Sequence, residues 1–91
     1  MLKFTYKGAV YSLEIAKVNP NSVVLTTNGF NFVYGLNNGG YRYLGEYSVT
    51  LGYALFVNFA LAFGVTTPLE ALDCAKSLGD ALTQYLEIDF A

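Results

Sequence analysis

The hydrophobic pattern along this 91-residue chain changes its period once, near residue 45. Before that point apolar and polar residues alternate, which is typical of strands that place one face on a core. Residues that favour turns separate the alternating segments from one another. These segments span residues 2–6, 9–18, 23–27, 30–36 and 41–44. The pattern predicts that residues 1–45 form an antiparallel β-meander of four or five strands.

Two of the turns carry strong signals. Asn28-Gly29 favours a type I′ hairpin turn, because both central residues of that turn need positive φ. Pro20, in the turn at residues 19–22, fixes φ at a value that suits a reversal of the chain. In the strand that follows Gly29, alternate residues share one face and are expected in the core; they are Phe30, Phe32, Tyr34 and Leu36.

A long uncharged segment follows the predicted sheet. The chain carries no charge from Tyr47 to Leu69, and its periodicity predicts a helix over residues 47–63, with Ser48 as N-cap and Gly64 as the stop. A helix without a polar stripe must be covered on nearly every side. We therefore expect this helix to be buried between the sheet and a second helix.

A second helix is predicted over residues 68–86. Thr67 can cap it, Pro68 suits the first helical position, and Glu70 completes a capping box. Its predicted buried stripe consists of Leu69, Leu72, Ala75, Leu78, Leu82, Tyr85 and Leu86. The chain is thus predicted to be one α+β domain, residues 1–91, in which an αα-hairpin packs on one face of the meander.

A membrane span is the alternative interpretation of residues 47–65, since a bilayer takes about 20 apolar residues. Asn58 would lie near the centre of that span, and the flanking charges, Glu46 and Glu70, are acidic. A span usually carries Lys or Arg at its cytoplasmic end. The pattern favours a buried core helix over a membrane helix.

The composition indicates self-association. Hydrophobic residues make up 54% of the chain and charged residues 13%, whereas a typical domain has about 45–50% and about 25%. We expect a homo-oligomer, most simply a dimer, or a protein partner; a monomer with an apolar surface is the alternative. The candidate interface residues are Val10, Val24 and Val33 on the second sheet face, and Gly52 and Ala60 on the helix.

The charges exclude some partners. Net charge is −2, so duplex nucleic acid, whose phosphates require clustered Lys and Arg, is not an expected partner. Residues 1–45 carry a balance of +3 and residues 68–91 a balance of −4. These opposite charges favour docking within or between chains.

The sequence lacks the usual catalytic residues. It contains no histidine and a single cysteine, Cys74, which excludes a Ser-His-Asp triad, a Cys-His pair and a Cys/His zinc site. We therefore predict no catalytic residue, metal site or cofactor, although carboxylate or tyrosine chemistry stays open as an alternative. The single thiol and the alternating N-terminal segment favour a cytoplasmic protein without a secretory signal.

One local group of residues suggests a ligand. Tyr34, Tyr41, Arg42 and Tyr43 combine aromatic rings with a guanidinium, which can stack a base and pair with a phosphate. The alternative is that these tyrosines form cross-strand pairs that stabilise the sheet.

The sequence thus predicts a non-catalytic binding protein that forms a small homo-oligomer and occupies the surface of a partner protein. By analogy of size, an inhibitor or accessory factor encoded by a phage or mobile element fits this description. The alternative is a small module that binds a nucleotide or a similar anionic aromatic ligand.

Overall fold

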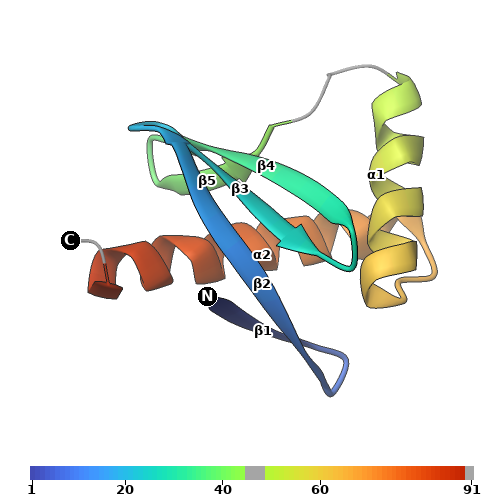
Figure 1. Ribbon diagram of the computed structural model, residues 1–91. Helices are drawn as coiled ribbons and strands as arrows, with labels where there is room; N and C mark the ends of the chain where they lie inside the picture. The colour runs from blue at the N-terminus through green and yellow to red at the C-terminus, as the bar shows by residue number, and fades with distance from the viewer. Residues whose placement is uncertain (45–48, 90–91) are drawn as a thin grey trace.

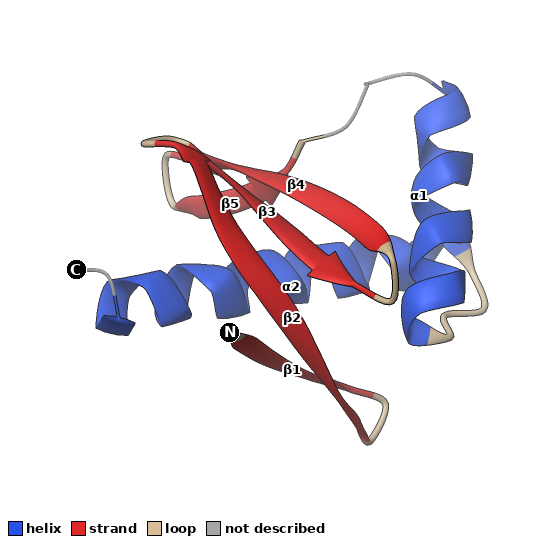
Figure 2. Ribbon diagram, in the orientation of Figure 1, coloured by secondary structure: helices blue, strands red, loops and turns tan. Residues whose placement is uncertain are grey.

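The computed structural model describes residues 1–44 and 49–89, with the backbone alone for 49–54 and 87–89. Five antiparallel strands pair in the order of the sequence, and two helices follow them (Figures 1 and 2). The elements are β1 (Leu2–Tyr6), β2 (Ala9–Asn19), β3 (Ser22–Thr27), β4 (Phe30–Asn37), β5 (Gly40–Tyr43), α1 (Val49–Phe63) and α2 (Pro68–Asp89). The predicted α+β fold with a meander sheet is confirmed.

Strand β2 belongs to two ladders. Its first half, Ala9 to Leu13, pairs with β1, whereas its second half, from Glu14 onward, pairs with β3. The sheet therefore curls around β2, and β1 lies apart from β3, β4 and β5 (Figure 1).

Two of the hairpin turns use left-handed backbone at both central residues. Asn28 and Gly29 have φ of 50° and 80°, as the type I′ signal predicts. Lys7 and Gly8 adopt the same pair of signs, with φ of 51° and 79°. Lysine rarely adopts positive φ, so this turn was only weakly marked in the sequence.

One face of the sheet, here called the inner face, forms the core with both helices. Aromatic rings join sheet to helix: the ring centroids of Phe32 and Phe59 lie 4.6 Å apart, and those of Tyr11 and Phe63 lie 4.8 Å apart. Aromatic pairs at these distances add to the stabilisation from burial. The buried hydrophobic side chains are Leu2, Phe4, Leu13, Val23, Leu25, Phe32, Tyr34, Leu55, Phe59, Ala62, Phe63, Val65, Ala71, Cys74, Ala75, Leu78 and Leu82.

Within residues 55–63, where the side chains of helix α1 are described, the helix is not enclosed on every side, contrary to the expectation that it would be buried between the sheet and α2. It stands at one end of the sheet, and the chain turns through 73° between α1 and α2 (Figure 1). Leu55 and Phe59 point into the core, but Leu61 is 66% exposed. The longer helix, α2, covers the middle of the inner face, so only one end of it remains for α1. The predicted start of α1, Tyr47 and Ser48, lies outside the described residues.

Helix α2 runs to Asp89, three residues beyond its predicted end at Leu86. The backbone N–H of Glu70 donates to the hydroxyl of Thr67 at 3.1 Å, which confirms Thr67 as a cap. Leu69 and Leu72 were predicted to be buried but are 74% and 54% exposed. The buried stripe centres on Ala71, Ala75, Leu78 and Leu82, and the two leucines lie outside it.

Leu36 is a further correction, since its side chain is 50% exposed although it shares the parity of Phe32 and Tyr34. It stands at the hairpin end of β4, one residue before Asn37, where the strand passes beyond the buried core.

Across the described residues, neither helix by itself has the length and apolar character needed to cross a membrane. The segments Leu55–Phe63 and Pro68–Leu86 meet that requirement only together, as a pair bent by 73°.

Candidate functional site

The tyrosines of the predicted ligand group lie on the inner face. Tyr34 is fully buried, and its hydroxyl donates a hydrogen bond to the carbonyl oxygen of Ala75 at 3.0 Å. Burial raises the pKa of Tyr34 far above its ordinary value. Both the ring and the hydroxyl are therefore used by the core.

Tyr43 and Tyr41 extend this packing. The rings of Tyr43 and Tyr34 meet edge to face with centroids 5.6 Å apart, and burial raises the pKa of Tyr43 as well. The backbone N–H of Tyr41 donates to the hydroxyl of Thr83 at 2.9 Å, while its ring packs against the core. These contacts agree with the alternative interpretation of the tyrosines, in which they form cross-strand pairs that stabilise the sheet.

Arg42 lies on the opposite, outer face of the sheet, because successive side chains of a strand alternate between faces. The structure therefore brings Tyr34, Tyr41 and Tyr43 together but does not bring Arg42 to them. The four residues do not line one pocket.

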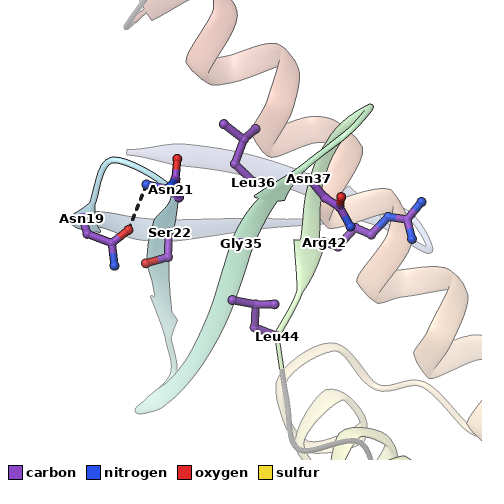
Figure 3. A pocket seen from close by; sticks show the side chains of 8 residues that line it. All are labelled: Asn19, Asn21, Ser22, Gly35, Leu36, Asn37, Arg42 and Leu44. Atoms are coloured by element: carbon purple, nitrogen blue, oxygen red, sulfur yellow. Dashed lines mark hydrogen bonds between the residues drawn. The ribbon is translucent and has the colours of Figure 1, made fainter.

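Arg42 instead borders a shallow depression on the outer face, with a volume of about 430 Å³. Ser22 pairs with Gly35 and Gly35 pairs with Arg42, so these three residues form a row across β3, β4 and β5. The other lining residues are Asn19, Asn21, Leu36, Asn37 and Leu44. Figure 3 shows the guanidinium of Arg42 directed away from Asn19 and Asn21. No sequence signal marked this depression, since it depends on the register of three strands.

A second row on the outer face is apolar. Ala16 pairs with Val24, Val24 pairs with Val33, and the backbone N–H of Leu44 donates to the carbonyl oxygen of Val33 at 2.7 Å. Ala16, Val24, Val33 and Leu44 thus lie side by side across β2, β3, β4 and the end of β5; we call them the outer apolar row. All four side chains are partly or fully exposed.

The structure places the predicted interface residues in three different regions. Val24 and Val33 are direct partners within the outer apolar row. Val10 is also exposed on the outer face, but it pairs with Thr5 of β1, in the other half of β2. Ala60 is partly buried against the core. Gly52 lies in the part of α1 for which the backbone alone is described.

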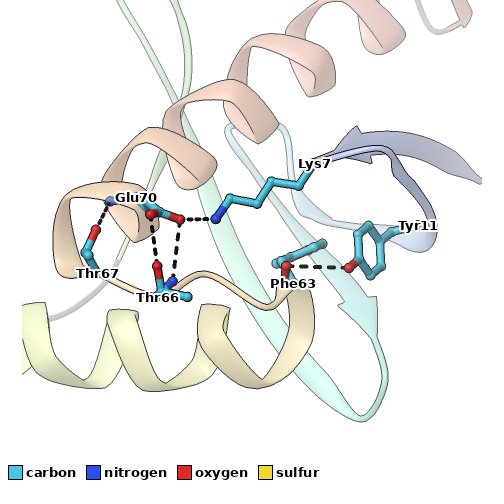
Figure 4. Close-up of polar contacts among 6 residues, drawn as sticks. All are labelled: Lys7, Tyr11, Phe63, Thr66, Thr67 and Glu70. Carbon is cyan, nitrogen blue, oxygen red and sulfur yellow. Dashed lines mark hydrogen bonds and ion pairs between the residues drawn. The ribbon is translucent and has the colours of Figure 1, made fainter.

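Polar contacts tie the β1–β2 turn to the start of α2 (Figure 4). Lys7 forms an ion pair with Glu70, whose carboxylate also accepts a hydrogen bond from the hydroxyl of Thr66 at 3.0 Å. The hydrogen bonds from Lys7 and from Thr66 lower the pKa of Glu70. This carboxylate is ionised and is bonded to Lys7 and Thr66. It therefore stabilises the contact between the β1–β2 turn and the start of α2.

Cys74 is fully buried, and desolvation raises the pKa of its thiol to about 12. A thiol with so high a pKa is a poor nucleophile at neutral pH. It acts as a small apolar side chain in the stripe of α2 that faces the sheet.

The described residues therefore form a packed inner face and an outer face that carries an apolar row beside a shallow polar depression. Comparison of the chain with protein-family models, with curated proteins and with solved structures finds no match.

Proposed function

We propose that this chain is a non-catalytic binding protein, which forms a small homo-oligomer and occupies the surface of a partner protein with its outer sheet face. The observation that carries the proposal is the outer apolar row. Both helices pack on the inner face, so neither covers Val24 and Val33 at the middle of the outer face. Apolar residues gathered on an otherwise open face are a common feature of protein interfaces.

The positions of the reactive groups support a non-catalytic role. The hydroxyl of Tyr34, the thiol of Cys74 and the carboxylate of Glu70 are reactive groups whose pKa values are shifted by their surroundings. Two of them are buried in the core and the third is held in an ion pair. Each of these groups thus serves the packing of helix on sheet.

The charges near the row suggest the chemistry of the partner. The exposed charged residues of the outer face include the basic residues Lys3 and Arg42 and the acidic residue Glu14. A partner surface that is apolar at its centre and acidic at its border complements this face.

The binding test compares the wild type with Val33→Lys, which places a charge in the middle of the outer apolar row. We expect wild-type protein to capture a partner from an extract of its native host, and Val33→Lys to lose that partner while it keeps its circular dichroism spectrum. Ser12→Lys, an exposed position on the same face but outside the row, is the matched control and should retain the partner. Equal capture by Val33→Lys and wild type would contradict the use of this face.

The oligomer is tested separately by light scattering over a range of concentrations. A mass of 9.9 kDa at every concentration, the mass of one chain, would contradict the homo-oligomer.

A second candidate function, binding of a small anionic ligand, rests on the depression beside Arg42. Its lining contains one guanidinium and three asparagine amides and no carboxylate, and such donors suit a phosphate or carboxylate group. A thermal-shift screen of nucleotides tests it. Stabilisation of the wild type that disappears in Arg42→Ala would support this function, and equal shifts in both proteins would count against it.

A further inference from the structure

One segment of β2 has a neighbour on only one side. Glu14 to Lys17 pair with Thr26 to Val23 of β3, but β1 begins at Leu2, which lies opposite Leu13. Figure 1 shows no strand beside this half of β2 on the side away from β3. The segment is therefore an open edge inside a strand whose first half is paired.

The hydrogen-bond alternation identifies which backbone groups face this edge. The N–H of Leu36 donates to the carbonyl oxygen of Asn21 at 2.6 Å, so odd-numbered residues of β3 bond to β4 and even-numbered residues bond to β2. Ala16, the partner of Val24, consequently bonds toward β3. Ile15 and Lys17 direct their N–H and C=O groups to the open edge, and no hydrogen-bond partner for these groups is found in the described part of the chain.

The other two edges are less accessible. At β5, the N–H of Tyr41 is already bonded to Thr83 of α2, and Gly79 of α2 lies against the carbonyl group of Tyr41. Strand β1 is tied to α2 near both ends, by the ion pair of Lys7 with Glu70 and by the hydrogen bond from the Met1 amino group to Tyr85. By contrast, Ala16 is exposed on the outer face of β2 and Lys17 is exposed on its other face.

We propose that a second copy of the chain pairs with this edge, antiparallel and about a two-fold axis at Ala16. This inference rests on the homo-oligomer of the proposed function and specifies its interface. In this register Ile15 of each copy exchanges hydrogen bonds with Lys17 of the other, so every outward-facing group of the two residues is satisfied. Glu14 lies opposite Val18 of the second copy and Lys17 opposite Ile15, so no like charges lie directly opposite each other.

The register makes the outer apolar row continuous across the dimer. The row runs perpendicular to the strands and reaches the open edge at Ala16. Ala16 of one copy then lies beside Ala16 of the other in a non-hydrogen-bonded pair, where Cα atoms are about 4.5 Å apart. The two rows join on one surface, which doubles the apolar face available to a partner.

The same edge carries features that limit growth beyond a dimer. The register shifts between Lys17 and Asn19, which marks a bulge, and a lysine and a bulge both discourage extended strand pairing. A two-fold contact also uses the edge of both copies and closes the assembly. A contact this short lies below the roughly 1,200 Å² of a stable interface, so the dimer should dissociate on dilution.

The first experiment is disulfide trapping. Ala16→Cys should form a covalent dimer under mild oxidation, because facing Cα atoms in this register meet the geometric requirement for a disulfide. Thr5→Cys places an equally exposed thiol on β1 and is the matched control, expected to react at least about tenfold more slowly because its Cα has no facing counterpart within disulfide range. Equal rates, or faster trapping at residue 5, would overturn the proposal.

The second experiment is light scattering of Lys17→Pro and Lys17→Ala. Proline removes the N–H that faces the open edge and leaves the ladder to β3 intact, whereas alanine keeps that N–H. We expect Lys17→Ala to dimerise like wild type and Lys17→Pro to dimerise at least about tenfold more weakly. If Lys17→Pro dimerises like wild type, this interface is wrong while the homo-oligomer stands. If wild-type protein stays monomeric at every concentration, the homo-oligomer fails with it.

Discussion

The hydroxyl of Tyr34 donates a hydrogen bond to the backbone carbonyl oxygen of Ala75, 3.0 Å away, across 41 positions of sequence. The bond joins the middle of β4 to the buried stripe of α2. The Tyr34 side chain is fully enclosed, and its ring meets Tyr43 edge to face. This contact fixes how the helix sits along the sheet.

Tyr34→Phe should destabilise the protein by about 1–2 kcal/mol, because it removes a buried hydrogen bond between the sheet and a carbonyl group of α2. Tyr11→Phe is the matched control, since the Tyr11 hydroxyl is 3.5 Å from the carbonyl oxygen of Phe63 and only partly buried. Urea denaturation of the two variants measures the difference. An equal loss of stability in both would contradict a special role for Tyr34.

Gly79→Ala should destabilise the protein although alanine favours helices over glycine by about 1 kcal/mol. A Cβ at residue 79 would lie 2.5 Å from the carbonyl oxygen of Tyr41 and would push α2 away from β5. We expect a net loss of about 1–3 kcal/mol, typical of overpacking. Ser77→Ala, at an exposed position of the same helix, should change the unfolding free energy by less than about 0.5 kcal/mol. A more stable Gly79→Ala would show that helix and strand separate freely.

The ion pair of Lys7 and Glu70 predicts a pH dependence. The folded state lowers the pKa of Glu70 below its ordinary value of 4.5, so the pair stabilises the protein above that pH and loses its effect as the pH falls through the folded value. Glu70→Gln removes this contribution, and its urea midpoint should fall less steeply than that of wild type below about pH 4.5. Parallel midpoint curves for the two proteins would contradict the assignment.

Cys74 should resist thiol reagents in the folded protein. Burial raises its pKa to about 12 from an ordinary value of 9.0, which lowers the thiolate fraction about a thousandfold. Labelling with a chromogenic disulfide should be slow in buffer and complete within minutes in denaturant. Rapid labelling of the native protein would show that α2 opens readily from the sheet.

The corrected stripe of α2 predicts contrasting effects of leucine substitutions. Leu78→Ala should cost about 2–5 kcal/mol, because residue 78 is fully buried. Leu69→Gln and Leu72→Gln should each change stability by less than about 0.5 kcal/mol, since both leucines are exposed. Thermal unfolding of the three variants checks this, and a large loss at residue 72 would show that the leucine is covered in solution.

Local signals were sufficient to predict the elements of the fold. Alternation and the Asn28-Gly29 turn gave the strands, and Thr67 with Pro68 gave the start of α2. These signals act over a few residues and do not depend on the rest of the chain. The coverage of α1 depends instead on the space that α2 leaves on the sheet, which no local pattern contains.

The predicted ligand group shows the same limit. Parity alone places Arg42 opposite to Tyr41 and Tyr43, but whether a row of side chains faces core or solvent depends on where the helices dock. The outer apolar row requires the registers of three strand pairs at once. Val24 and Val33 were identified by parity alone, whereas Ala16 and Leu44 were not, because their alignment arises only when the strands are assembled.

Because β2 takes part in both ladders, one strand determines the facing of the entire sheet. A slip of β2 by a single residue would turn Leu13 outward and Glu14 inward, and it would shift the partners in β1 and β3 together. Errors of pairing therefore cannot stay local in this molecule. The turns at Lys7-Gly8 and at residues 19–22 lie at the two ends of β2. Together they fix the register of β2 with both of its neighbours and so disfavour misfolding.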